Sequence, residues 1–468
     1  MAITLQFFGA TEQVTGSLYL LRTASHTVML ECGLIQGGRA KETSNRDPFP
    51  VAINEIDAVV VSHAHIDHSG RLPLLVKRGY KGPIYTQHAS KALCEIMLPD
   101  SGYLNEKDVE WENKKRKKSG KPLLEALYTR ADAEESLAQI DSIDYDDPTE
   151  ILPGLSLTFH DAGHILGSSI VELTCAENGR ERTLVFSGDL GYRDAPVMDP
   201  PVRLRKADVV MMESTYGDRL HRTFDATIEE LTDLFTTARA GQGNILIPAF
   251  TVGRTQDLLY LMSKYEKEWG LDKWKIFIDS PMGIEATSAY ARYRNLYSAH
   301  IFKPGSNQPD LPNVFMTRST EESMTINSIK SGAVIIAGSG MCSGGRIVHH
   351  LKNNISRPEC HLVFVGYQAF GTLGRRIVDG AEKIRLWGEY YPVRAHVHTI
   401  GGLSAHADQA DLIDWYGAFD GHPPVYLVHG EERSQVPLAE KLRAQFDAPV
   451  TIARHGQTID LTTRRSQS

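Results

Sequence analysis

Four side chains able to bind a metal ion lie within six consecutive positions, in the segment SHAHIDH at residues 62–68. Imidazole nitrogens and carboxylate oxygens suit Zn²⁺ or a similar divalent ion. Four such close neighbours cannot all reach one ion without strain. His63 and His65 alternate and can point one way, whereas Asp67 and His68, at the start of a predicted helix, can point another. The pattern predicts two metal ions about 3.5–4 Å apart, as in two-metal hydrolases.

Two metal ions need further ligands, and two later residues qualify. His164 follows a predicted strand and precedes small residues that would let the backbone come close. Asp189 lies between two glycines at the end of another predicted strand, and its two oxygens could bridge two cations. Taken alone, either residue is more often a turn or capping residue. Together with the histidine segment, they predict a completed metal centre.

Strands must hold these residues in place. Segments rich in β-forming residues and bounded by turn residues predict strands at Thr4–Phe8, Ser17–Arg22, Thr27–Glu31, Ile56–Val61, Leu155–His160, Ser168–Thr174 and Arg182–Phe186. A helix is expected over Asp67–Lys77, directly after the histidines. Strands early and late, with few helices between them, favour two sheets packed together.

The middle of the chain differs because short apolar strands alternate with helices. The strands are expected at Val209–Met212, Asn244–Pro248, Lys275–Ile278, Ala333–Ala337 and His361–Val365, with helices such as Thr227–Ala240 and Thr255–Glu268 between them. Such alternation predicts a parallel sheet whose ligand-binding loops follow the strands. The tail returns to strands at His396–Ile400 and Val425–His429 around a helix at Asp408–Phe419, and the pattern assigns it to neither part.

Composition narrows the class of protein. The chain has 468 residues and a net charge of −8, which argues against coating nucleic acid by bulk charge but not against a locally positive cleft. The five cysteines form no CxxC pair, and we expect no secretory signal, no membrane span and a cytoplasmic protein. One basic block, Lys114–Lys118 with Lys121 nearby, is either a solvated helix face or a patch that contacts phosphates.

The histidine segment, Gly163-His164 and Ser187-Gly188-Asp189 together resemble the metallo-β-lactamase superfamily. The alternating middle segment resembles the β-CASP domain, an insertion that defines a nucleic-acid-processing branch. Motifs similar to that branch are Glu213-Ser214-Thr215-Tyr216-Gly217, the Gly338–Arg346 loop, Ser404-Ala405-His406 and Val428-His429-Gly430-Glu431. The resemblance covers nearly the whole chain and is strongest to bacterial and archaeal relatives of the endonuclease that cleaves pre-mRNA at its 3′ end. It implies an α/β fold: an αββα sandwich of residues 1–208 and 391–468, with residues 209–390 as the inserted β-CASP domain.

The resemblance also implies how the ligands are shared. His63, His65 and His164 would hold one zinc ion, Asp67, His68 and His429 would hold the other, and Asp189 would bridge them. Two Zn²⁺ per chain are expected, with Mn²⁺ as an alternative. The sequence departs from the family at Glu31, where an Asp usually supports the histidine segment. We expect the longer side chain to rearrange that support without abolishing metal binding.

By the same resemblance the chain is a metal-dependent ribonuclease that hydrolyses phosphodiester bonds of single-stranded RNA with a hydroxide shared by the two zinc ions. Asp67, Asp189, His406 and Glu213 are the expected catalytic residues. His406 would be the general acid, oriented by Glu213, and its alternative role is a structural cap at a helix start. Candidates to hold RNA phosphates are Arg254, Ser339, Gly340, Gly345, Arg346, Thr372 and Arg375, although each glycine loop could equally be a tight turn. Tyr216 and Tyr367 are candidates for base stacking.

Three other functions compete with this one. A small-molecule hydrolase of the same superfamily needs only the metal domain, so the long insertion argues against it. A DNA nuclease of the same group tends to have Val at the last ligand position, whereas His429 indicates RNA. A non-catalytic RNA-processing scaffold typically loses ligands, and here none is missing. The expected partner is single-stranded RNA, and a homodimer remains open.

Overall fold

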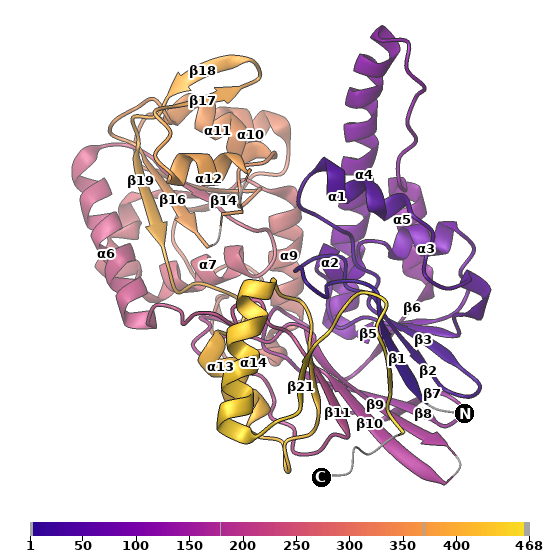
Figure 1. Cartoon of the computed structure of the whole chain (residues 1–468). Helices are drawn as coiled ribbons and strands as arrows, with labels where there is room; N and C mark the ends of the chain where they lie inside the picture. Colours follow the sequence, from indigo (N-terminus) through magenta and orange to yellow (C-terminus); the bar gives the residue numbers. More distant parts are fainter. Residues whose placement is uncertain (1–2, 178, 367, 370, 463–468) are drawn as a thin grey trace. The chain divides into compact units, whose positions relative to one another are not determined.

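The computed structural model describes residues 3–177, 179–366, 368–369 and 371–462. The chain divides into two compact units (Figure 1). Unit 1 comprises Met1–Arg193, Pro200–Leu220 and His406–Ser468, and unit 2 comprises Asp194–Asp199 and His221–Ala405. Unit 2 is therefore built mainly from one long insertion into unit 1.

Unit 1 contains two sheets. The first has the order β22-β1-β2-β3-β4-β5-β6, from strands β1 (Thr4–Phe7), β2 (Tyr19–Arg22), β3 (Thr27–Leu30), β4 (Ala58–Val60), β5 (Ile84–Gln87), β6 (Ile140–Ile143) and β22 (Thr458–Asp460). The second has the order β21-β20-β11-β10-β9-β8-β7, from strands β7 (Thr149–Leu152), β8 (Leu155–Asp161), β9 (Ser169–Glu177), β10 (Arg180–Phe186), β11 (Val209–Met212), β20 (Val425–Leu427) and β21 (Val450–Ile452).

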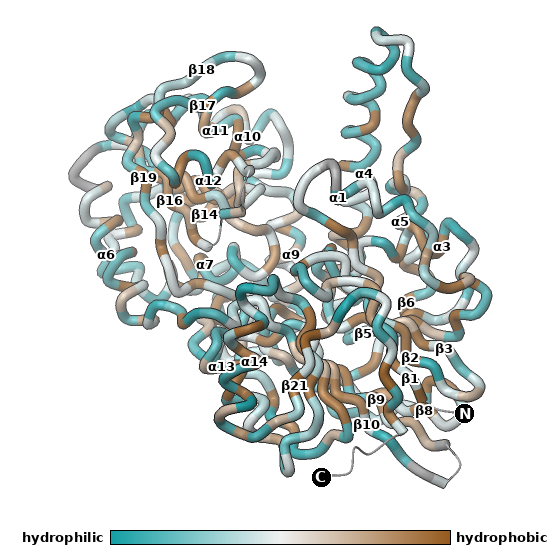
Figure 2. Tube along the Cα trace, viewed as in Figure 1, coloured by the Kyte–Doolittle hydropathy of each residue, from teal (hydrophilic) through white to brown (hydrophobic). Residues whose placement is uncertain are grey.

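The two sheets pack face to face over one apolar core. Phe7 and Tyr19 from the first sheet meet Phe159, Phe186 and Met211 from the second, all buried. The ring centroids of Tyr19 and Phe186 are 5.5 Å apart in an edge-to-face contact, which aromatic pairs favour. Hydrophobic residues gather in β9 and in the Leu184–Phe186 part of β10, whereas the other end of β10 is polar (Figure 2). The predicted two-sheet sandwich is confirmed.

Helices cover the outer faces of both sheets. A second apolar cluster joins the far face of the second sheet to α13 (Gln409–Tyr416) and α14 (Glu432–Phe446). The remaining helices of unit 1 are α1 (Arg39–Glu42), α2 (Ile66–Ser69), α3 (Leu72–Lys77), α4 (His88–Lys118) and α5 (Arg130–Ser136). None of the helices in the described part of the chain is both long and apolar enough to cross a bilayer.

The helix predicted over Asp67–Lys77 is interrupted after Ser69. The backbone of Cys32, just beyond β3, donates a hydrogen bond to His68 O and accepts one from Arg71 N, both at 2.8 Å. These bonds replace the regular helical ones, so the chain forms α2 and α3 in sequence. The same exchange ties the histidine segment to the end of β3.

Unit 2 is built on a parallel sheet of order β14-β13-β15-β12-β16-β19, as the alternation of strands and helices predicted. Its strands are β12 (Ile245–Pro248), β13 (Lys275–Ile278), β14 (Val314–Met316), β15 (Ala333–Ala337), β16 (His361–Val365) and β19 (His396–Ile400), beside a hairpin of β17 (Lys383–Leu386) and β18 (Glu389–Pro392). Its helices are α6 (Phe224–Gly241), α7 (Arg254–Lys264), α8 (Glu266–Trp269), α9 (Pro281–Arg292), α10 (Thr320–Ile326), α11 (Arg346–Asn354) and α12 (Leu373–Val378).

Strand pairing places the unit boundaries differently from the predicted ones at 208/209 and 390/391. β11 pairs in parallel with β10 and β20, so it completes the second sheet of unit 1. β19 pairs with β16, so the chain leaves unit 2 only at Ala405. A short apolar strand buried on both faces looks the same in either parallel sheet, which is why the sequence pattern misplaced β11.

Candidate metal centre

Unit 1 brings the predicted ligands together at the ends of its strands. β10, β11 and β20 run in parallel, so the residues that follow them emerge at one edge of the second sheet. These residues are Asp189, Glu213 and His429. The histidine segment follows β4 of the first sheet, and His164 lies in the turn between β8 and β9.

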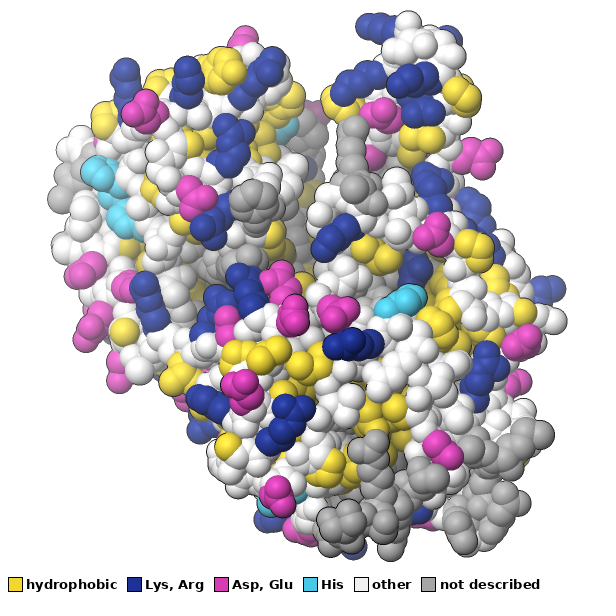
Figure 3. All heavy atoms as spheres, viewed as in Figure 1, with side chains coloured by type: hydrophobic (Ala, Val, Ile, Leu, Met, Phe, Trp, Pro, Cys, Tyr) yellow, Lys and Arg dark blue, Asp and Glu magenta, His cyan; other side chains and the backbone are white. Residues whose placement is uncertain are grey.

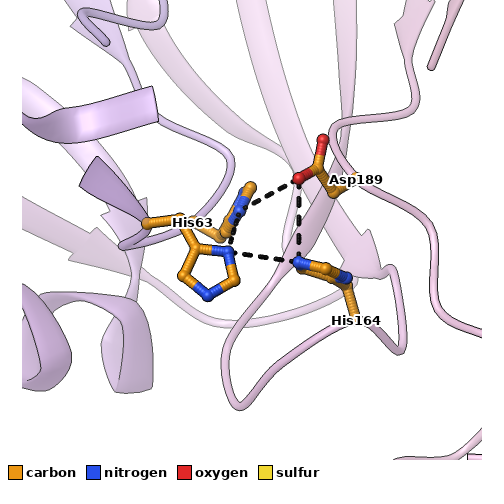
Figure 4. Close-up of side chains that lie close together, drawn as sticks. His63, His164 and Asp189 are labelled. Atoms are coloured by element: carbon orange, nitrogen blue, oxygen red, sulfur yellow. Dashed lines mark hydrogen bonds and ion pairs between the residues drawn. The ribbon is translucent and has the colours of Figure 1, made fainter. Parts of the chain in front are cut away.

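The first cluster contains His63, His65, His164 and Asp189 (Figure 4). His65 Nδ1 lies 3.1 Å from His63 Nε2 and 3.2 Å from His164 Nε2. Asp189 Oδ2 lies 3.5 Å from His63 Nε2 and 3.6 Å from His164 Nε2. Ligands at about 2.0–2.2 Å from a tetrahedral zinc ion are separated by similar distances, about 3.3–3.6 Å. The cluster can hold one such ion.

The second cluster contains Asp67, His68 and His429. His429 Nε2 lies 3.3 Å from His68 Nε2 and 3.5 Å from Asp67 Oδ2. Asp189 reaches this cluster too, since its Oδ2 is 3.3 Å from His68 Nε2 and its Oδ1 is 3.5 Å from His429 Nδ1. Asp189 thus stands between the two clusters, where a bridging carboxylate would stand. We refer to both clusters together as the metal centre.

The chemistry of the donors fits divalent cations. Asp189 is 2% exposed, and its Oδ1 accepts no hydrogen bond from any described residue. Burial would raise the pKa of this carboxyl, but the neighbouring histidines, His429 and His68 foremost, hold it well below its usual range. Burial lowers the pKa of His65 to about 4, so this imidazole is neutral, the form that binds metal. A buried anion beside the neutral imidazoles of His63 and His65 is a site that a cation would complete.

Glu31 supports the histidine segment with both carboxylate oxygens. Its Oε1 accepts a hydrogen bond from Ser62 N at 2.6 Å, and its Oε2 accepts from Ser62 Oγ at 3.1 Å and pairs with His68 Nδ1. The side chain is fully buried, and its backbone has a φ of +64°. The Glu31 side chain is one methylene longer than the Asp that the family usually has here. It fits in this position and still contacts His68.

Replacing Glu31 by Gln should weaken zinc binding about 10- to 100-fold, since a ligand histidine loses its charged partner. The affinity can be measured by competition with a coloured chelator. Glu55→Gln, which changes an exposed carboxylate of the same unit, is the matched control and should leave the affinity unchanged. Equal zinc affinity in the Glu31 variant and the control would contradict this supporting role.

His406 and Glu213 form a pair beside the metal centre. His406 Nδ1 lies 3.2 and 3.3 Å from the two oxygens of the buried Glu213, whose Oε1 also accepts from Leu190 N at 2.6 Å. The ring of His406 is 4.4 Å from that of His164 between centroids. Burial opposes the charge on His406, but the carboxylates of Glu213 and Asp189 outweigh it and raise its pKa to about 9.

The helix start after His406 has its own cap. Asp408 Oδ1 accepts hydrogen bonds from Ala410 N at 2.9 Å and Asp411 N at 3.1 Å, so it caps α13. His406 itself pairs with Gly191 through a backbone bridge, which holds it next to the Asp189 loop. The alternative role of His406 as a helix cap is therefore filled by Asp408.

Two supporting residues were missed by the sequence reasoning. Thr215 Oγ1 lies 3.1 Å from His429 Nδ1 and donates to His429 O at 3.2 Å. Ser62 Oγ lies 3.0 Å from His63 Nδ1. Both hydroxyls belong to segments that the sequence had singled out, but only Ser62 is adjacent in sequence to a predicted ligand, His63. Tyr216, a proposed stacking residue, lies 6.1 Å from His406 between ring centroids, and Tyr367 lies outside the described residues.

The predicted phosphate-binding residues all lie in unit 2, whereas the predicted metal ligands lie in unit 1. Several of them form hydrogen bonds or ion pairs with other residues of unit 2. Arg346 Nη1 donates to the buried Asp279 at 2.7 Å and to Thr317 O at 2.9 Å, and its Nη2 donates to Arg318 O at 2.7 Å. Asp279 also pairs with His350 Nε2 at 2.6 Å. Much of the Arg346 guanidinium is thus used to tie α11 to the loops that follow β13 and β14.

The other candidates have structural roles in the same unit. Arg254 pairs with Asp257 at 3.1 Å, and Arg375 pairs with Asp379 at 2.9 Å. Thr372 caps α12. Ser339, Gly340 and Gly345 lie in the turn between β15 and α11, where a Cβ on Gly345 would come within 2.3 Å of Gly338 O and one on Gly340 within 3.0 Å of Phe250 N. Phosphate binding by these residues stays a prediction.

The similarities to known proteins cover both units of the chain. Three family models match: the "Metallo-beta-lactamase superfamily" over residues 13–249, the "Beta-Casp domain" over 255–377 and the "Zn-dependent metallo-hydrolase RNA specificity domain" over 390–453. A protein of Thermus thermophilus named "Ribonuclease TTHA0252" is 39% identical over 97% of this chain and 98% of its own length.

More distant similarities are consistent with these matches. The "Transcription termination factor FttA" of Methanocaldococcus jannaschii is 32% identical over 95% of this chain and 69% of its own length. A solved structure of a protein of unknown function from Enterococcus faecalis V583 has a TM-score of 0.54 and 13% identity, and covers 98% of this chain and 100% of that one. At that identity the likeness concerns the fold alone.

Proposed function

The chain belongs to the metallo-β-lactamase superfamily and to its β-CASP branch, and we propose that it is a metal-dependent ribonuclease that hydrolyses phosphodiester bonds of single-stranded RNA. The observation that carries this proposal is the convergence of five histidines and Asp67 on the buried Asp189. A relative that shares 39% of its residues is named a ribonuclease. The family model over residues 390–453, which include His406 and His429, is named for RNA specificity.

We propose that His63, His65 and His164 hold one divalent ion, that Asp67, His68 and His429 hold a second, and that Asp189 contacts both. Such ions, when bound, make water more acidic and offset negative charge on a phosphoryl group. Imidazole and carboxylate donors suit Zn²⁺, with Mn²⁺ as the alternative. The charge of Asp189 and the neutral form of His65 favour this occupancy.

His406 would supply a proton to the leaving group. In hydrolysis a water oxygen replaces an ester oxygen at phosphorus, and the departing oxygen takes up a proton. Glu213 engages Nδ1 of His406, which leaves Nε2 as the nitrogen that can donate. The carboxylates of Glu213 and Asp189 keep the imidazole of His406 protonated at neutral pH, and the contact with Glu213 fixes its orientation. His406 would therefore act as a general acid and Glu213 as its positioning residue.

A denaturing gel tests the proposed function. An end-labelled single-stranded RNA and the DNA of the same sequence would be incubated with the zinc-loaded protein, with the protein treated with a chelator, and with the treated protein after zinc or manganese is returned. RNA should be cut, the chelator should stop the cutting, and the metal should restore it. Preferred cutting of DNA would indicate the DNA-nuclease alternative. No cutting despite about two zinc ions per chain would favour a scaffold.

A further inference from the structure

A long part of α4 and the segment that follows it extend from unit 1 without burying any residue. Gly102 is the last buried residue of the helix, and the next buried residue along the chain is Leu127. We call residues 103–126 the arm. Figure 1 shows this part of α4 rising beyond the rest of unit 1. The packed first half of α4 nucleates this extension, which buries none of its own residues and so leaves its surface open to a binding partner.

The arm has two halves, the end of the helix and a returning segment that runs antiparallel to it. Asn113 Nδ2 donates to Leu124 O at 2.9 Å, and Leu124 N donates back to Asn113 Oδ1 at 2.8 Å. Arg116 Nε donates to Pro122 O at 2.6 Å. The returning segment is thus held alongside the helix, and the end of the arm has a defined shape.

Positive charge gathers at the free end of the arm. Residues 114–124 contain five lysines and one arginine and no acidic residue. Figure 3 shows these dark blue side chains at the end of the arm. Some positive charge complements the C-terminus of a helix, but like charges three and four positions apart, such as Lys114 and Lys118, repel each other. A polyanion would relieve that repulsion.

Exposed aromatic and aliphatic side chains accompany this charge. Trp111 is 54% exposed, and the ammonium of Lys115 lies 3.1 Å from the centroid of its ring. Tyr103, Leu104, Leu123 and Leu124 are also exposed. Lysines beside an exposed indole are the combination with which proteins bind single-stranded nucleic acid, because the charge meets phosphates and the ring stacks on bases.

The start of α4, the helix that carries the arm, is fixed beside the metal centre. At the start of α4, Ser90 Oγ donates to Gly167 O at 2.7 Å, in the turn that carries His164. The 31 residues of α4 then span about 46 Å at 1.5 Å per residue. The end of the arm therefore lies several nanometres from the ligands, within the same compact unit.

We propose that the arm is a second binding site for single-stranded RNA, which holds the strand away from the metal centre through Lys114, Lys115, Lys117, Lys118 and Trp111. That the bound polyanion is RNA rests on the proposed function. The charge and shape of the arm are independent of that function. A strand bound at both places would dissociate more slowly than one bound only at the metal centre, since each contact raises the local concentration of the strand at the other.

Fluorescence anisotropy on a labelled RNA of about 30 nucleotides tests the proposal, in an Asp189→Asn background so that the RNA stays intact. Changing the four lysines to Gln should raise Kd at least about tenfold and lower the slope of log K against log salt by about 0.7 for each lost contact. Changing them to Arg should keep Kd within about twofold. Trp111→Ala alone should raise Kd about tenfold.

The matched control changes four exposed basic residues elsewhere on unit 1, Lys81, Arg205, Lys206 and Arg454, to Gln. Equal Kd values for this control and the lysine variant would overturn the proposal. So would displacement of the RNA by a polyaspartate peptide at equal charge concentration, which would assign the arm to an acidic protein. Failure of the wild-type protein to cut RNA would reject the proposed function but would leave arm-dependent RNA binding as a separate result.

Discussion

Replacing Asp189 by Asn should lower RNA cleavage by about 10³-fold or more, equivalent to at least about 4 kcal/mol of transition-state stabilisation. Asn has nearly the same shape as Asp, so the change removes the charge while preserving packing. The lost carboxylate contacts four of the proposed ligand histidines at 3.3–3.6 Å. Without its charge, we expect the zinc content to fall below two ions per chain. Single-turnover cleavage and zinc analysis measure both effects.

Asp146→Asn is the matched control for this variant. Asp146 is an exposed carboxylate of the same unit that pairs with His160, and it has a φ of +59°, which Asn tolerates. The control should keep both activity and zinc. An Asp189→Asn protein with unchanged zinc content and cleavage rate would contradict the assignment of this residue to the metal centre.

The second large effect is expected at His406. His406→Gln should lower the rate of cleavage about 10²- to 10⁴-fold, the range in which a general acid contributes, while the zinc content stays the same. The two results together separate proton donation from metal binding. Loss of zinc in this variant would instead identify His406 as a ligand, since its Nδ1 is only 3.9 Å from Asp189 Oδ2.

The pH dependence gives an independent test of the same residue. A general acid works in its protonated form, so activity should fall as pH rises through the pKa of His406. That pKa is raised to about 9, and cations bound beside the ring would lower it from there. His406→Gln should remove this alkaline decline from the profile of kcat/KM against pH. Glu213→Gln should move it to lower pH, because the carboxylate that raises the pKa is lost.

The sequence predicted which side chains lie close together better than it predicted the elements between them. Asp189, Glu213 and His429 follow strands of one sheet, and the ends of parallel strands meet at one edge whatever the rest of the sheet looks like. The strand β11 was assigned to the wrong unit because its four residues are apolar on both faces. Only its pairing with β10 and β20 reveals its place, and no local pattern encodes that pairing.

The helix α4 was predicted only in part, as a possible solvated helix face at Lys114–Lys118, for a different reason. Periodicity reveals a helix when one side packs against a core, and the second half of α4 buries no residue. Arg346 illustrates a third limit. Its position after a glycine loop favoured a phosphate contact, but the carboxylate it meets, Asp279, is 67 residues away. A partner so distant in sequence cannot be inferred from spacing.

The interruption of unit 1 by unit 2 has a consequence for the order in which the protein is made. His68 and His429, which belong to one ligand cluster, are separated by 361 residues. At about 5–20 residues per second, a ribosome needs about 20–70 s to pass from one to the other. Throughout that time the emerging chain exposes the early histidines without the last one. A chain released before His429 is made would lack one member of the second cluster, so the proposed cleavage of RNA would have to wait until synthesis has passed that residue.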